Sequence, residues 1–217
     1  MLALTVLAFV VIIISSSKRV KAADKAAVVT ELKDVKHINK IVAIGNVEVF
    51  ITQGTKESLK VYDKYYSKNA LVQWEAGELR IASFEKKKLT IEVTVNNLSS
   101  IEASGQAVVR TMNELSAINL DIKLKDNATA QLEAKAVSIN SSLEGGSKLE
   151  LSGESESQHL ALDGAAQYEA TRFTSPTRSM LLSEGTAASV SQDMKSTSIK
   201  SSAGIVAKGN ALVFDLE

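Results

Sequence analysis

The sequence predicts an all-β chain, a single-stranded parallel β-helix-like solenoid of about six coils with an N-terminal β cap and a preceding signal or anchor segment. Short alternating segments recur about every twenty residues after residue 98, a period typical of solenoids. Only 5% of the residues are aromatic, so β-branched and small aliphatic side chains must fill the core. No stretch beyond the first residues has a convincing helical period.

The first element is an apolar run at residues 2–14, which three basic residues follow. It is too short for a spanning helix, which needs about twenty residues, but it has the length of a signal-peptide core. Val20 and Ala22 supply the small side chains of a cleavage site after Ala22. We therefore expect export, with residues 1–22 as a signal peptide or an N-terminal anchor and residues 23–37 as a polar leader. A buried element of the domain is the alternative.

The domain itself is expected at residues 38–217, with a cap of larger side chains at 38–97. Residues 47–54 and 89–95 alternate apolar and polar side chains as half-buried strands do. Residues 71–84 are expected to form a hairpin around the "EAGE" turn. This sheet would cover the open end of the repeats at 98–217, since a solenoid end needs a cap.

Each repeat begins with a residue suited to a tight bend. Glycine adopts positive φ without cost, and Asp is a usual substitute. The spacings between successive bends are 21, 19, 19, 21 and 19 residues. The predicted bend residues are Gly105, Asp126, Gly145, Gly164, Gly185 and Gly204.

Two residues after each bend comes a column of mostly small side chains. Small residues fit a corner where neighbouring coils approach closely. We expect each coil to hold three short strands and three bends, with parallel pairing about 4.8 Å apart. The column consists of Ala107, Ala128, Ser147, Ala166, Ala187 and Val206.

Composition excludes several functions. The chain has 25 basic and 25 acidic residues and a formal net charge of zero, so its overall charge favours neither nucleic acid nor an anionic membrane. It has no cysteine, which excludes disulfides, thiolate metal sites, cysteine nucleophiles and a lipid on an N-terminal cysteine. Hydrolase and nucleotide-binding motifs are absent. We therefore expect no enzyme, no cofactor and no nucleic-acid partner.

Three acidic residues, Glu144, Asp163 and Glu184, each precede a bend glycine. If the coils are in register, their carboxylates stack about 5 Å apart. A divalent cation such as Ca²⁺ would bridge such a stack. The alternative is three separate bend residues in contact with water.

The sequence allows two interpretations for the role of several other polar and aromatic groups. Lys86, Lys87 and Lys88 form a basic run that could touch anionic glycans or lipid, or could protect an edge strand as a solvated turn. A cluster of aromatics could stack on sugar rings or pack the cap. His37 and His159 are expected to be exposed and without a role. The aromatic cluster comprises Tyr62, Tyr65, Tyr66 and Trp74.

Three stretches carry a family resemblance: "INKIVAIGNVEVFITQGTKESLKV" at 38–61, "GELRIASF" at 77–84 and "LTIEVTVNNLSSIEASGQAVV" at 89–109. Together with the glycine-centred repeats, they resemble the putative auto-transporter adhesin, head GIN domain family. The resemblance extends from residue 38 to the C-terminus. It implies an exported bacterial envelope protein with a β-solenoid-like fold and no established catalytic site.

These observations leave three hypotheses for function. The first is a non-catalytic adhesin or interaction module, periplasmic or at the cell surface, whose partner is an envelope protein or a surface glycan. The second is a scaffold that self-associates through the edge of the C-terminal "ALVFDLE" at 211–217. The third is a carbohydrate-active β-helix enzyme, which would need convergent acidic groups in a groove. In each case residues 2–14 could tether the chain to a membrane.

Overall fold

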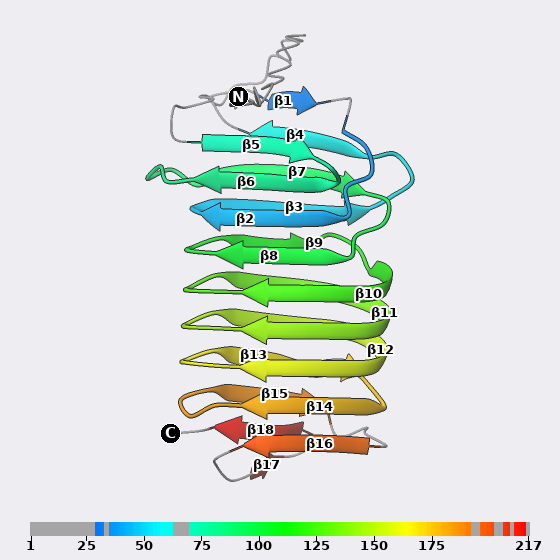
Figure 1. The fold of residues 1–217 in the computed structure, drawn as a ribbon, viewed down its shortest axis with the longest axis vertical. Helices are drawn as coiled ribbons and strands as arrows, with labels where there is room; N and C mark the ends of the chain where they lie inside the picture. The colour runs from blue at the N-terminus through cyan, green and yellow to red at the C-terminus, as the bar shows by residue number, and fades with distance from the viewer. Residues whose placement is uncertain are drawn as a thin grey trace, which may run out of the picture.

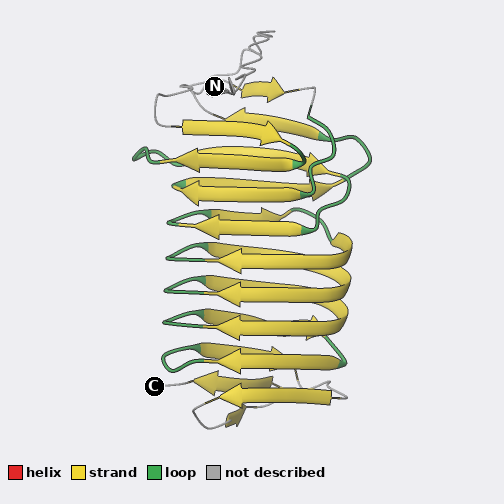
Figure 2. Cartoon of the chain, in the orientation of Figure 1, coloured by secondary structure: helices red, strands yellow, loops and turns green. Residues whose placement is uncertain are grey.

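The computed structural model describes residues 29–32, 35–62, 70–191, 196–201, 206–208 and 211–215. These residues form eighteen β-strands in one mixed sheet and no helix (Figure 1; Figure 2). The all-β prediction is confirmed. No helix that could cross a bilayer exists in this part of the chain. The predicted signal segment, the bend at Gly204, and Tyr65 and Tyr66 lie outside the described residues.

The sheet is folded into two flat arms that face each other across the core. Arm A, in front in Figure 1, consists in spatial order of β5 (Ala70–Glu75), β6 (Glu78–Ser83), β2 (Lys40–Gly45), β8 (Ser100–Ser104), the later parts of β10 (Leu115–Leu124), β11 (Thr129–Leu143) and β12 (Lys148–Leu162), then β14 (Thr177–Leu182) and β16 (Ser196–Ser201).

Arm B lies behind it. In spatial order it consists of β1 (Val29–Leu32), β4 (Ser58–Tyr62), β7 (Leu89–Val95), β3 (Val47–Gln53), β9 (Val108–Thr111), the early parts of β11 and β12, β13 (Gln167–Thr174), β15 (Ala187–Ser191), β18 (Ala211–Asp215) and β17 (Val206–Lys208).

Pairing between successive turns of the chain is parallel. Thr129 pairs with Lys148 and Leu143 with Leu162, so β11 and β12 match over their length at an offset of 19 residues. The two arms meet at tight glycine bends on one side, the bend side, and at a wider turn on the other, the corner (Figure 1). The expectation of three strands and three bends per coil is wrong, because β11 and β12 run around the corner as continuous strands.

The first turns do not follow sequence order. Strand β2 pairs with both β6 and β8, and β3 pairs with both β7 and β9. Residues 40–53 therefore lie between the turn formed by β6 and β7 and the turn formed by β8 and β9. The hairpin expected at 71–84 is confirmed as antiparallel β5 and β6.

The bend side holds a stack of residues in the left-handed conformation. Gly105, Gly145, Gly164 and Gly185 have φ between 71° and 81°, and Asp126 has φ of 60°. The stack continues to Gly45, with φ of 81°, which the sequence period did not identify. A β-carbon on Gly105 would lie 2.9 Å from the Gly45 Cα atom, so the turns are too close there for a side chain.

Small side chains fill the interior beside this stack. Ala107, Ala128, Ser147 and Ala166 are fully buried, as expected from their column. In the next turn the buried residue is Thr186, and Ala187 is partly exposed. The assignment of Ala187 to the column is wrong, because Ala187 pairs with the outward-facing Gln167. Larger aliphatic residues from both arms fill the rest of the core.

The C-terminal strand is paired on both sides. Strand β18 runs antiparallel to β15 and to β17. Residues 211–213 therefore do not form the open edge that the sequence suggested, because β17 pairs with them on the side away from β15.

Candidate functional site

The corner near the N-terminal end of the stack is built differently from the rest. Between β11 and β12 the corner is continuous strand. In the earlier turns three separate loops form it: residues 35–39, 54–57 and 96–99. Loops carried by a rigid scaffold are where binding residues concentrate, so this corner is the candidate site.

Buried apolar residues fix two of these loops, the first and the third. Val35 and Ile38 anchor the first loop and Leu98 anchors the third, with exposed fractions of 6% or less. Backbone bonds add to them: the Asn39 N–H donates to the Gly77 carbonyl at 3.0 Å, and Ser99 N–H donates to the Asn39 carbonyl at 2.8 Å. The polar side chains between the anchors therefore start from a fixed backbone.

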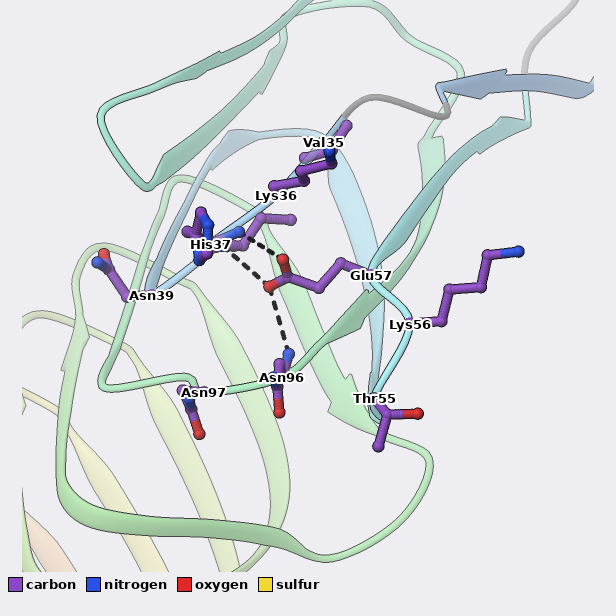
Figure 3. Close-up of a pocket in the computed structure, with 10 residues that line it drawn as sticks. Val35, Lys36, His37, Asn39, Thr55, Lys56, Glu57, Asn96 and Asn97 are labelled. Atoms are coloured by element: carbon purple, nitrogen blue, oxygen red, sulfur yellow. Dashed lines mark hydrogen bonds between the residues drawn. The ribbon is translucent and has the colours of Figure 1, made fainter.

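Glu57 ties the three loops together. Its Oε2 accepts a short hydrogen bond from the His37 N–H, and its Oε1 accepts from Ile38 N–H at 3.0 Å and Asn96 N–H at 3.3 Å (Figure 3). Hydrogen bonds to a carboxylate are stronger than those between neutral groups. Both oxygens of this carboxylate thus accept hydrogen bonds from backbone N–H groups of the other two loops.

The loops surround an open pocket of about 540 Å³, within the size range of small-ligand sites. Its side chains are mostly hydrogen-bond donors: three amides, a hydroxyl, two ammonium groups and an imidazole. Figure 3 shows Glu57 between the loops, with its carboxylate turned toward His37 and Asn96 and with the Lys56 and Thr55 side chains pointing away from it. Apart from Glu57, the polar residues of the pocket are Lys36, His37, Asn39, Thr55, Lys56, Asn96 and Asn97.

His37 is exposed, as expected, but it lines this pocket. Its φ of 58° is left-handed, which costs a residue with a side chain energy and recurs at functional sites. The short bond from its N–H to Glu57 holds that conformation. The other histidine, His159, is exposed on arm A, between Asn140 and Ser179 in the neighbouring strands.

The arrangement suits recognition by hydrogen bonding. Amides, hydroxyls and ammonium groups can contact hydroxyl or carboxylate groups of a ligand. Among the described residues that line the pocket, Glu57 is the carboxylate, and both of its oxygens accept backbone hydrogen bonds. The sequence reasoning missed this site, although the polar clusters "TQGTKE" and "NNLSS" at the strand ends mark two of its loops.

The three acidic bend residues behave as separate exposed groups. Glu144 forms an ion pair of 3.1 Å with Lys125, which precedes the bend at Asp126 in the neighbouring turn. Asp163 and Glu184 are exposed. Over the residues that the structure describes, no group of three or more His, Asp or Glu side chains is placed to hold a metal ion.

Arm B carries a second polar feature, a ladder of side chains across neighbouring strands. Arg110 contacts Glu48 at 3.5 Å and donates to Gln131. Gln131 donates to Glu150 at 3.1 Å, and Arg172 donates to the same carboxylate at 2.7 Å. Alternating donors and acceptors thus bind the outer surface of successive turns together.

A shallow depression of about 440 Å³ lies on arm B beyond this ladder, between Phe50 and Met112. One of its walls is the Glu92 carboxylate, which accepts a hydrogen bond of 2.7 Å from the Tyr62 hydroxyl. That bond, with partial burial, raises the pKa of Tyr62 to about 12. The second described residue of the aromatic cluster, Trp74, is 41% exposed on β5.

The core near the C-terminal end contains a buried polar cluster. Arg178 is 1% exposed, and its Nε donates to the Gln158 Oε1 at 2.7 Å. Gln158 in turn donates a short hydrogen bond to the Tyr168 hydroxyl. Burial raises the pKa of Tyr168 well above its usual value. The cluster is inside the fold, so we assign it a structural role.

Comparison with protein families gives one match. The family described as "Putative auto-transporter adhesin, head GIN domain" matches residues 37–211. A search of curated proteins found no match.

Solved structures with a similar fold come from Bacteroides and Parabacteroides species. A putative adhesin from Bacteroides fragilis is 19% identical, with 82% of this chain and 94% of that chain covered and a TM-score of 0.62. A putative adhesin from Parabacteroides merdae is 12% identical, with 72% and 77% covered and a TM-score of 0.62. A protein from Parabacteroides distasonis described as a putative lipid binding protein is 14% identical, with 81% and 94% covered and a TM-score of 0.59. At these identities the likeness concerns the fold alone.

Proposed function

Since the chain belongs to the putative auto-transporter adhesin, head GIN domain family, we propose that it is a non-catalytic exported cell-envelope protein that binds a partner through a rigid β-solenoid. The parallel register of β8 to β14 supports the solenoid, because each turn pairs with the next at an offset near twenty residues. Extended solenoid surfaces suit binding over many contacts.

The corner pocket is the observation that carries the proposal. It presents amide, hydroxyl and ammonium donors on loops that buried anchors hold. Among the described lining residues, the Glu57 carboxylate accepts backbone hydrogen bonds, so it holds the loops in place. We propose a surface glycan or a polar segment of an envelope protein as the ligand.

A binding measurement with matched variants tests this. The purified protein is applied to an array of bacterial surface polysaccharides and to envelope vesicles. Replacing Asn97 and Lys56 by Ala should weaken binding about tenfold, the effect of losing one or two hydrogen bonds. The control replaces exposed residues far from the pocket, Asn140→Ala with Lys148→Ala, and should bind normally. Equal binding by both variants would reject the pocket, and turnover of any polysaccharide would reject a non-catalytic role.

Self-association is the second candidate. Strand β16 is the last strand of arm A in the described part of the chain and pairs with β14 there. An edge strand is a template for pairing with another copy. Sedimentation velocity over a range of protein concentrations distinguishes the two, since a ligand-binding monomer keeps one sedimentation coefficient.

A further inference from the structure

The loop that joins β6 to β7, residues 84–88, presents an unusual surface. Phe84 is 75% exposed, the most exposed large apolar side chain described. Lys86, Lys87 and Lys88 follow it and are also exposed. Although the net charge of the whole chain is zero, this loop has three lysines and one glutamate, so its local charge is positive.

The loop is held in place. Asn46 Nδ2 donates to the carbonyls of Glu85 and Lys86, both at 3.1 Å. Asn46 N–H donates to the Ser83 carbonyl at 2.7 Å, and Leu89 N–H donates to the Asn46 carbonyl at 3.0 Å. Phe84 is therefore displayed by a fixed backbone, which removes part of the entropy cost of binding.

Phe84 extends an apolar strip on the outer surface of arm A. Leu71 pairs with Ala82, and Ala82 pairs with Ile44, so their side chains share one face. Leu71 is 45% exposed and Ile44 is partly exposed, whereas Ala82 is buried between them, at 9%. Ala82 is two residues before Phe84, which places the strip beside the loop. We call Leu71, Ile44 and residues 84–88 the end patch.

The end patch lies where the N-terminal segment joins the fold. Strand β6 is one strand from the end of arm A, and β1 is the end strand of arm B (Figure 1). The apolar run at residues 2–14 precedes β1 by 14 residues, 15–28. That length reaches at most about 50 Å when extended, so in the anchored form, in which residues 1–22 are not cleaved, a membrane that holds the run lies close to this end.

We propose that the end patch docks on an anionic lipid bilayer, the same membrane that the chain's own apolar run enters. Phe84 and Leu71 would enter the headgroup boundary, and the lysines would face anionic headgroups. One apolar contact alone gives marginal membrane binding, and a basic cluster beside it supplies the second signal. The proposal rests on the proposed envelope location but is independent of the corner pocket and its ligand.

The chain's lack of cysteine allows a clean test. Full-length protein with Lys88→Cys, which keeps Lys86 and Lys87 of the end patch, or with Asp163→Cys carries one fluorophore and is reconstituted in vesicles with brominated acyl chains. Both positions are exposed on the bend side, but Asp163 lies about 24 Å, or five strand spacings, farther from the end. With phosphatidylglycerol present, we expect quenching at position 88 and little at 163. Adding Phe84→Ser, or Lys86→Ser with Lys87→Ser, should lower quenching at 88 to the value at 163.

The other outcomes are equally informative. Equal quenching at the two positions would overturn the proposal, as would quenching at 88 that is the same in pure phosphatidylcholine. In roughly 0.5 M salt the Debye length falls to about 4 Å, so the selective quenching should decrease. Self-association without vesicles that Phe84→Ser abolishes would make a second copy the occupant and overturn the lipid assignment. Polysaccharide binding is measured separately, so failure of the proposed function remains distinguishable.

Discussion

Gln53 and Asn113 exchange two hydrogen bonds across the corner, although sixty residues separate them in sequence. The Gln53 N–H donates to the Asn113 Oδ1 at 2.8 Å, and Asn113 Nδ2 donates to the Gln53 carbonyl at 3.0 Å. The Gln53 side chain also donates to the carbonyls of Asn96 at 2.8 Å and Ser116 at 3.0 Å. At this corner, side-chain hydrogen bonds therefore connect neighbouring turns, whereas between β11 and β12 the backbone pairing of continuous strands connects them.

The first prediction concerns this pair. Asn113→Ala should lower the free energy of unfolding by about 1–3 kcal/mol, because backbone groups of Gln53 lose their partners. Gln53→Ala should cost a similar amount, and the double variant should cost less than the sum, because both act in one network. Urea denaturation measures all three. Asn140→Ala, whose amide bonds the exposed Asp121 at 2.8 Å, is the control and should change stability little. Additive effects at the corner would contradict the network.

The corner also shows what the sequence could and could not reveal. The period of about twenty residues was readable after residue 98, because there each turn pairs with the next one along the chain. It was hidden before that point, because β2 and β3 lie between turns formed by later residues. The stacked partners Gly45 and Gly105 are sixty residues apart.

The pocket was missed for the same reason. Its lining comes from three loops that are separate in sequence. The role of Glu57 depends on its hydrogen bonds to the backbone of His37 and Asn96, and the sequence alone does not show that these residues are neighbours. The acidic bend residues differ from the pocket residues, because their spacing was visible in the sequence. Their regular spacing is real, but Glu144 forms an ion pair with Lys125, and among the described residues no group of three such side chains is placed to hold a metal ion.

The second prediction concerns the bend stack. Gly105→Ala should destabilise the protein by at least about 2 kcal/mol, because a left-handed residue gains a side chain and that side chain meets backbone. The new β-carbon would lie 2.9 Å from Gly45 Cα. Gly54→Ala is the control, because its added carbon meets the end of the Thr94 side chain at 3.1 Å, which can move. Thermal unfolding compares the two, and similar losses would contradict the role of the stack.

Asp126 gives the third prediction. It adopts φ of 60° without being glycine, and its Oδ2 accepts a hydrogen bond of 2.9 Å from the Gly105 N–H. Asp126→Gly relieves about 1 kcal/mol of backbone strain but removes a bond of comparable value, so stability should change little. Asp126→Ala keeps the strain and loses the bond, and should be clearly less stable than Asp126→Gly by chemical denaturation. The reverse order would show that residue 126 carries no left-handed strain, and a gain of about 1 kcal/mol in Asp126→Gly would show that the carboxylate contributes nothing.

The fourth prediction concerns pH and the ion pairs of Lys40, which contacts Glu78 at 3.2 Å and Glu102 at 3.1 Å. Burial favours the neutral form of Glu78, but hydrogen bonds from Lys40 and Arg80 outweigh it and lower its pKa below the ordinary value of 4.5. A lowered carboxyl pKa stabilises the fold above the unfolded value, and this contribution disappears as pH falls through the folded value. Glu78→Gln should therefore cost up to about 1 kcal/mol at neutral pH and nothing in strong acid. A cost independent of pH in urea titrations would exclude the charge as its cause.

The last prediction concerns the buried phenol of Tyr168. Its folded pKa is raised, first by burial, so its contribution to stability is complete below the unfolded pKa of about 10 and is lost as pH rises above it. Tyr168→Phe leaves the buried Gln158 amide without its oxygen partner, which should cost about 1–3 kcal/mol at neutral pH. Since the variant cannot ionise there, its deficit against the unsubstituted protein should shrink above pH ~10. Tyr62→Phe is the matched control: its hydroxyl bonds Glu92 at the surface, so its loss should cost less at neutral pH. Urea unfolding at both pH values decides this, and a deficit that stays the same in alkali would show that the phenol does not ionise on unfolding.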